Sequence, residues 1–110
     1  MSLEDVAESD TAAYVAIFND DYKRMLHRDP ENIPFYLGTG TGEALLANRL
    51  SYFFNLKGPS LTLDTGCSGS LVALHLACQS VRTGESKQAI VGGVNLILDP
   101  EAMVAMSNLK

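Results

Sequence analysis

The sequence has no long apolar run, few basic residues and only two cysteines, and each of these shortages excludes a class of protein. No stretch reaches the ~18 uninterrupted apolar residues that a membrane span needs. The opening, MSLEDVAESD, is acidic and lacks the basic-then-apolar order of a signal peptide. We therefore expect an intracellular, cytoplasmic protein with no membrane partner.

Positive charge is scarce. Eight Lys and Arg residues face thirteen Asp and Glu residues, which gives a net charge of −5. The basic residues are scattered along the chain and form no patch in the sequence. Because neutralising phosphates requires clustered Lys and Arg, we expect no nucleic acid partner.

The two cysteines, Cys67 and Cys78, do not suit a disulfide or a metal site. On one helix they would be separated by roughly 16 Å of rise, whereas a disulfide requires Cα atoms within about 7 Å. Two cysteines and two histidines without close ligand spacing make no zinc motif. We expect neither a disulfide nor a bound metal.

Apolar segments of strand and helix character alternate along the 110 residues, which fits one domain of α/β architecture. The expected strands are residues 12–18, 60–66 and 88–98. The expected helices are residues 19–29, 43–56 and 68–84, and a short one that starts at Asp99. Gly84 is expected to end the third helix as a left-handed cap. The last helix is expected to have Asp99 as its N-cap and Pro100 at its first helical position. Residues 29–34 are expected to form a loop and residues 38–42 a flexible glycine turn.

Two of these elements are too apolar for so small a chain. Residues 89–98 are apolar on both alternating faces, as in a strand covered on both sides. The helix over residues 68–82 is apolar around most of its circumference, as in a helix buried all round. We infer that further polypeptide covers them, either a partner subunit or the rest of a larger domain.

The stretch LTLDTGCSGSLVALHLACQS places Cys67 where a strand becomes a helix. Unpaired N–H groups and the helix dipole at such an end lower the pKa of a thiol and can bind an oxyanion. The pattern resembles a nucleophile elbow, although Thr65 replaces the first glycine of G-x-S-x-G. The residues alone leave two interpretations open, a nucleophile and a small buried thiol, whereas Cys78 is expected to be a core residue.

No base for this thiol is evident in the sequence. His75 lies eight residues along the same helix, roughly 12 Å of rise from Cys67, where contact requires about 3 Å. His27 lies in MLHRDP, a segment expected to be exposed.

Two other motifs are expected to be structural. GTGTGEA lacks the Lys-Ser/Thr of a P-loop and has Glu43 where G-x-G-x-x-G requires glycine, so it predicts a turn and not a phosphate site. Asp20 and Asp21 are expected to form a solvated helix start.

The stretch GPSLTLDTGCSGSLVALHLACQSVRTGES, followed by AIVGGVNLIL, resembles the active-site region of the β-ketoacyl synthase domain of type I polyketide synthases, particularly the fungal reducing ones. DYKRMLHRDPENIPFYLGTGTGEALLANRLSYFFNLKGPS and LEDVAES resemble the stretch just upstream in that family. The resemblance implies a thiolase-like layered αβαβα fold of two related halves. Residues 1–110 would be a partial N-terminal domain, a middle segment of the N-terminal half that is incomplete at both ends.

The resemblance also implies an activity and partners. Cys67 matches the family's nucleophile, which receives an acyl group from an acyl-carrier protein as a thioester. A malonyl unit on the carrier's phosphopantetheine arm then loses carbon dioxide and attacks that thioester. The family works as a homodimer, and no cofactor is bound directly.

Two departures from the family are visible. Its usual motif is D-T-A-C-S-S-S, whereas this chain has Gly66 for the alanine and Gly69 for the middle serine, which adds backbone freedom near Cys67. The family's two catalytic histidines, with the lysine and phenylalanine that support them, lie beyond Lys110, so the isolated chain is expected to be inactive. The alternatives are a segment of a fatty acid synthase condensing domain and a non-catalytic truncated remnant.

Overall fold

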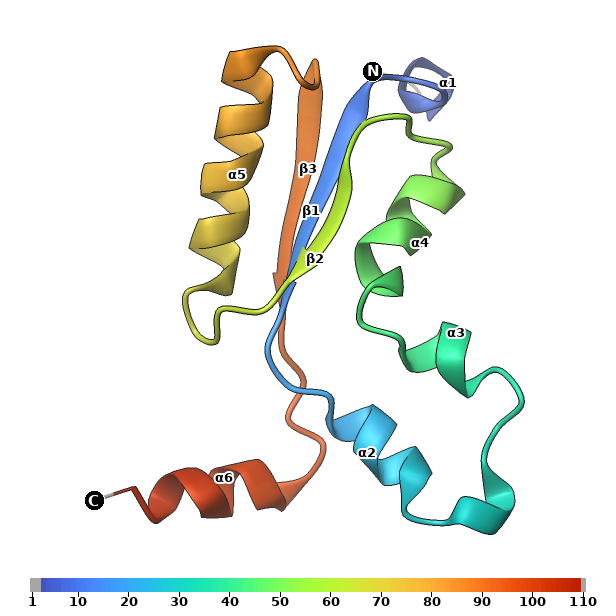
Figure 1. Ribbon diagram of the computed structural model, residues 1–110, viewed down its shortest axis with the longest axis vertical. Coiled ribbons are helices and arrows are strands. Elements are labelled where there is room, and N and C mark those ends of the chain that lie inside the picture. The colour runs from blue at the N-terminus through green and yellow to red at the C-terminus, as the bar shows by residue number, and fades with distance from the viewer. Residues whose placement is uncertain (1–2, 110) are drawn as a thin grey trace.

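A computed structural model describes residues 3–109, and its centre is a three-stranded parallel sheet (Figure 1). Its strands are β1 (Thr11–Ile17), β2 (Ser60–Leu63) and β3 (Gln88–Val94), in the order β2-β1-β3. The central strand β1 is hydrogen-bonded to both neighbours. Because all three strands are parallel, their carboxyl ends meet at one edge of the sheet.

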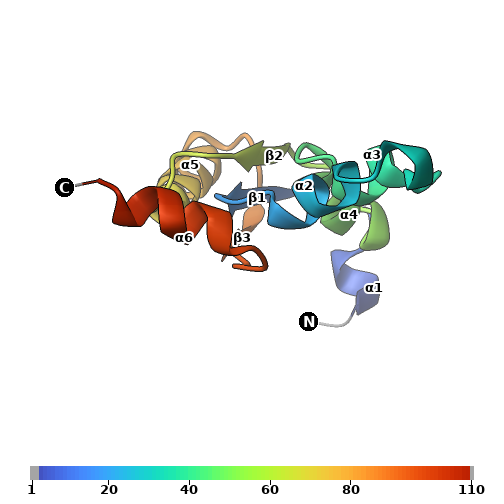
Figure 2. The same ribbon diagram turned by 90° about the horizontal axis from the view of Figure 1, so that it is seen from below.

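One long helix covers each face of the sheet (Figures 1 and 2). Helix α5 (Gly69–Thr83) packs Ala73 and Ala77 against alternate β1 residues that include Tyr14. Helix α4 (Leu45–Phe53) packs Ala47 against the residues between them, such as Val15. Strand β1 is therefore buried on both sides, as expected for the central strand of a parallel sheet.

The remaining elements are shorter. They are α1 (Leu3–Val6), α2 (Asp21–His27), the 3₁₀ helix η1 (Pro30–Asn32), α3 (Leu37–Thr41) and α6 (Pro100–Ser107). Helices α2 and α6 lie beyond the carboxyl edge of the sheet, below it in Figure 1.

Both predicted helix caps are confirmed. Gly84 ends α5 in the left-handed conformation, with φ +77°. The carboxylate of Asp99 accepts a hydrogen bond from the Glu101 N–H at 3.0 Å, and Pro100 opens α6. The sequence signals at these two positions are local, and the structure uses them as expected.

The predicted glycine turn and the end of the third strand are wrong. Residues 37–41 form α3, in which the Gly40 N–H donates to the Tyr36 carbonyl at 2.7 Å. Strand β3 ends at Val94 rather than at residue 98, because its partner β1 ends at Ile17 and offers no further ladder. Residues 95–98 turn away towards α2.

The outer face of α5 is apolar and uncovered in the described residues. Ala73 and Ala77 are buried against the sheet, while Leu71 is 71% exposed and Leu74 is 47% exposed. The expectation that this helix is buried all round is therefore not met by residues 3–109 alone. The inference that further polypeptide covers it accounts for this exposed surface.

Among residues 3–109, no helix is both long and apolar enough to cross a membrane. Both cysteines are exposed free thiols, so the prediction that Cys78 is a core residue is not met within the described residues. Within the same described residues, no group of three or more His, Cys, Asp or Glu side chains is placed to hold a metal ion.

Candidate active site

Cys67 lies in the tight turn between β2 and α5, as the sequence predicts, and its side chain is exposed. The turn is closed on both sides of the residue. The carboxylate of Asp64 accepts a hydrogen bond from the Gly66 N–H at 2.8 Å, and the Gly69 N–H donates to the Gly66 carbonyl at 3.1 Å. We call residues 64–69 the elbow.

Two hydroxyl groups link the elbow across Cys67. The Ser68 hydroxyl donates to the Thr65 carbonyl at 2.9 Å, and the Ser68 and Thr65 hydroxyl oxygens lie 3.0 Å apart. The backbone before and after Cys67 is thus joined by side-chain hydrogen bonds. None of these four hydrogen bonds involves the Cys67 side chain.

Gly66, the residue before Cys67, has a backbone conformation that favours glycine. Gly66 has φ +63°, in the left-handed region that residues with a Cβ atom rarely adopt. The backbone freedom expected of this departure is used to form the turn. A residue with a Cβ atom would be strained there whatever the space around it.

The second departure, Gly69, is explained by a close contact. A Cβ atom at Gly69 would lie 2.8 Å from the Cβ atom of Ala16 on β1, closer than two carbon atoms can approach without a shift. The first turn of α5 therefore packs directly on the sheet. In this chain a serine at position 69 would force the helix and β1 apart.

Neither histidine supplies a base to the thiol. His75 is exposed on α5, and Nδ1 of His27 donates to the Lys23 carbonyl at 2.7 Å within α2. Within residues 3–109, no hydrogen bond joins a histidine to Cys67. The described residues therefore place no histidine against the Cys67 thiol.

Asp21 is an organising residue that the sequence analysis missed. The expectation of a solvated carboxylate is wrong, because Asp21 is only 1% exposed. Its Oδ2 accepts hydrogen bonds from the N–H groups of Leu98 and Asp99 at 3.1 and 3.2 Å, and Arg24 pairs with its Oδ1. The i, i+3 spacing of Asp21 and Arg24 is visible in the sequence, but the partners more than seventy residues away are not.

The surroundings of Asp21 set its charge state. Burial raises the pKa of this carboxyl, but hydrogen bonds from the Leu98 and Asp99 N–H groups and from Arg24 outweigh burial. The net result is a pKa below the ordinary value of 3.8. The hydrogen bond from Asp21 in turn raises the pKa of Arg24.

A second ion-pair cluster adjoins the first. Arg28 pairs with Asp99 and, at 3.1 Å, with Glu101. Together the two clusters join α2 to the start of α6. We call Asp21, Arg24, Arg28 and Asp99 the polar corner.

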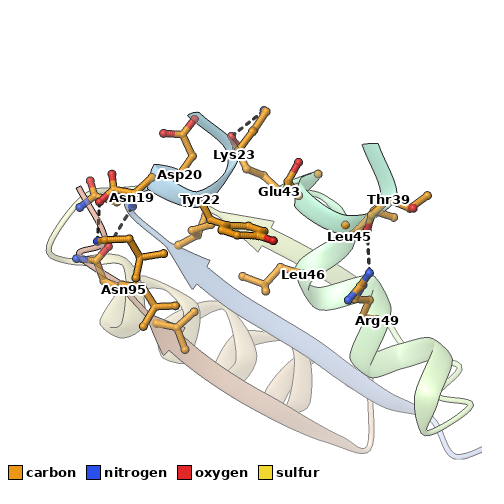
Figure 3. A pocket seen from close by; sticks show the side chains of 18 residues that line it. Asn19, Asp20, Tyr22, Lys23, Thr39, Glu43, Leu45, Leu46, Arg49 and Asn95 are labelled. Atoms are coloured by element: carbon orange, nitrogen blue, oxygen red, sulfur yellow. Dashed lines mark hydrogen bonds and ion pairs between the residues drawn. The ribbon is translucent and has the colours of Figure 1, made fainter. Parts of the chain in front are cut away.

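One pocket of the described residues lies away from Cys67. It has a volume of about 270 Å³ and lies between the end of β1, helices α2 to α4 and residues 94–98 (Figure 3). Its cationic groups are already paired. Lys23 lies 3.7 Å from Glu43, and Arg49 donates to the Thr39 carbonyl at 3.1 Å. The glycine-rich segment of α3 forms a wall of this pocket.

The parallel sheet, the two covering helices and the exposed cysteine at a strand–helix elbow define an α/β protein with a candidate nucleophile. All of residues 1–110 match the family model described as "Beta-ketoacyl synthase, N-terminal domain". The chain therefore belongs to the β-ketoacyl synthase family. Ketosynthases of this family are condensing enzymes of the acyltransferase type.

Similar proteins place the chain among polyketide synthases. It is 57% identical over 107 residues to a highly reducing polyketide synthase of Preussia isomera and 50% identical over 109 residues to the compactin diketide synthase of Penicillium citrinum. These matches cover 97% and 99% of this chain and 4% of each relative. The chain is thus a small part of the length of such synthases.

Solved structures confirm the fold. The ketosynthase from module 6 of the bacillaene synthase of Bacillus subtilis 168 matches with a TM-score of 0.82 and 37% identity, over 96% of this chain and 17% of that one. The predicted thiolase-like α/β fold is therefore confirmed, with the described sheet forming part of it. The polyketide synthase resemblance is confirmed as well.

Proposed function

We propose that residues 1–110 carry the nucleophile of a polyketide ketosynthase and that Cys67 holds the growing acyl chain. The observation that supports this most directly is the exposed thiol at the elbow between β2 and the start of α5. The first N–H groups of a helix lack partners within that helix and carry partial positive charge. We include in the proposal that free N–H groups at this end of α5 bind the oxyanion that forms when the sulfur attacks a carbonyl.

The proposed reaction has two covalent steps. Cys67 loses its proton, and its thiolate attacks the carbonyl of an acyl thioester. The C–S bond to the carrier breaks, and the carrier leaves as a thiolate that takes up one proton in place of the one that Cys67 lost. A malonyl thioester then loses carbon dioxide, and its carbanion attacks the Cys67 thioester. The new carbon–carbon bond forms as the Cys67 thiolate is released.

The substrates and partners in this proposal are those that the β-ketoacyl synthase family implies. The acyl and malonyl groups arrive on the phosphopantetheine arm of an acyl-carrier protein, and no cofactor is bound by the chain itself. We include in the proposal that the intact domain is a cytoplasmic homodimer. Its two catalytic histidines come from sequence beyond residue 110, which agrees with the lack of a histidine beside Cys67 in the described residues.

Condensation by a completed domain tests this proposal. The completed domain joins residues 1–110 to the remaining ketosynthase sequence of the Preussia isomera relative. With an acyl and a malonyl carrier it is expected to form a β-ketoacyl product, which Cys67→Ala abolishes and Cys78→Ala leaves intact. A product that persists in Cys67→Ala, or its absence from the wild-type domain, contradicts the proposal.

The 110-residue chain provides a further comparison in the same assay. It is expected to yield no β-ketoacyl product, because residues 3–109 contain no base that contacts the thiol. Product formation by the 110-residue chain would contradict the view that the histidines are supplied from outside it.

A further inference from the structure

On the side of β3 that faces α5, the residue nearest the elbow is a glycine and has no side chain. Ala89 and Val91 pack against the core cluster that includes α5. Gly93 is the next residue on that side, two positions nearer the carboxyl edge. The helix can therefore approach the sheet more closely at its first turn than farther along.

The contact at Gly93 is specific to the residue after the elbow. A Cβ atom at Gly93 would lie 2.6 Å from the Cβ atom of Ser70 and 3.3 Å from its Cα atom. Carbon atoms in ordinary contact are 3.5–4.0 Å apart, so a side chain at position 93 would displace Ser70 by about 1 Å. Ser70 follows Cys67 by only three residues.

The neighbouring glycine on the same strand has no such contact. A Cβ atom at Gly92 would lie 3.8 and 3.9 Å from the two methyl carbons of Val15, which is ordinary van der Waals distance. Gly92 also pairs with Val15 in the sheet, on the side of α4. The two glycines lie in the same strand, but only Gly93 is close to the first turn of α5.

We propose that Gly93 is a positioning residue for the reaction at Cys67, because its missing side chain lets Ser70 and the first turn of α5 seat against β3. This inference depends on the proposed function of Cys67. This contact between Ser70 and Gly93 sets the distance of the Cys67 sulfur and of the first N–H groups of α5 from the carboxyl edge of the sheet. A Cβ atom at Gly69 would likewise lie 2.8 Å from the Cβ atom of Ala16, so the same turn also packs closely on β1.

The test is the rate at which Cys67 of the completed domain takes an acyl group from a short acyl thioester of pantetheine. Gly93→Ala is expected to lower the acylation rate at saturating thioester roughly 100-fold, the effect of a ~1 Å misplacement. The thioester concentration that gives half of that rate is expected to stay the same. Gly92→Ala is expected to behave as the wild type. Equal rates for the two glycine variants overturn the proposal.

A double variant separates displacement from simple loss of folding. Ser70→Gly removes the atom that a Cβ at position 93 would strike, so Ser70→Gly combined with Gly93→Ala is expected to recover most of the lost rate. If Gly93→Ala does not fold, the double variant decides alone. A double variant that is unfolded, or as slow as Gly93→Ala, overturns the proposal.

Failure of the proposed function gives a different result. A wild-type completed domain that takes no acyl group on Cys67 contradicts the nucleophile itself. A wild-type domain that is acylated on Cys67, with Gly93→Ala equally fast, contradicts only the role of Gly93.

Discussion

The elbow and the polar corner both lie beyond the carboxyl edge of the sheet, and they are held in opposite ways. At the elbow and just after it, two glycines allow close packing, because Gly69 lies against Ala16 and Gly93 lies against Ser70 with no side chain between them. In the polar corner, charged side chains span the gap between α2 and α6, and Asp21 accepts two backbone hydrogen bonds. The close approaches around the elbow involve no titratable group, whereas the hydrogen bonds and ion pairs of the polar corner require ionised carboxylates.

This difference suits the work proposed for each region. A nucleophile needs a position that does not shift with pH or salt, and packed backbone provides it. The corner joins segments distant in the sequence, where the ends of β1 and β3 diverge. Buried hydrogen bonds to a charged group hold such segments strongly, but only while the group is charged.

The largest expected loss of stability comes from Asp21→Ala. The substitution leaves the Leu98 and Asp99 N–H groups and Arg24 without their acceptor at a buried site. The melting temperature of the completed domain is expected to fall substantially. Asp20→Ala is the matched control, because Asp20 contacts the same Arg24 at 3.0 Å but is 39% exposed, and it is expected to change little. Equal effects would contradict the importance of the buried carboxylate.

The corner is also expected to respond to acid. The pKa of Asp21 is lower in the folded chain than its ordinary 3.8, so its contribution to stability is complete above that value and is lost as pH falls towards the folded pKa. Melting temperatures from pH 7 down to pH 3 measure the loss. Asp21→Ala is expected to show a smaller decline below about pH 4 than the wild type. A parallel decline would contradict the assignment.

Gly69→Ser, which restores the usual family residue, is expected to destabilise this chain by about 1–3 kcal/mol, as overpacking does. The added Cβ meets Ala16 at 2.8 Å. The midpoint of denaturant unfolding of the completed domain measures the change. Adding Ala16→Gly is expected to recover part of it, and a stable Gly69→Ser domain would show that the elbow is not tightly seated.

Gly66→Ala, the other restoration, is expected to cost about 1–2 kcal/mol, because a residue with a Cβ atom is held at φ +63°. The nearest atom to that Cβ is 3.9 Å away, on Phe18, so the cost is conformational and not steric. Denaturant unfolding measures it. An unchanged midpoint would mean that the turn adapts to alanine.

The smallest effect is expected at Gly40, away from both regions. Gly40 lies within α3, and a Cβ atom there would meet nothing within 4 Å. Gly40→Ala is expected to stabilise the domain by about 0.5–1 kcal/mol, because alanine loses less conformational freedom in a helix. A destabilising result would show that the glycines of α3 are needed for more than the helix.

Local sequence signals predicted the elements that local physics decides. Asp99 and Gly84 act as caps, and Cys67 stands at a strand–helix junction, because capping and chain direction depend on neighbours in the sequence. The two apolar faces of β1 follow from its run of small and branched residues. The place of Cys67 in the fold was therefore predictable.

The features that sequence reasoning missed depend on distant partners. Asp21 accepts hydrogen bonds from the N–H groups of Leu98 and Asp99, and no residue near Asp21 in the sequence predicts these hydrogen bonds. Glycine propensity argued against a helix at residues 37–41, yet α3 forms and contacts α2 and α4. The end of β3 at Val94 is set by where β1 stops.

The central claim is that the sulfur of Cys67 carries the acyl group, and peptide mapping by mass spectrometry tests it most directly. The completed domain is incubated with an acyl thioester of pantetheine and digested at low pH, where thioesters survive. The account predicts the added acyl mass on the peptide that contains Cys67 and its loss in Cys67→Ala. An acyl group found on another residue while Cys67 stays free would contradict the account.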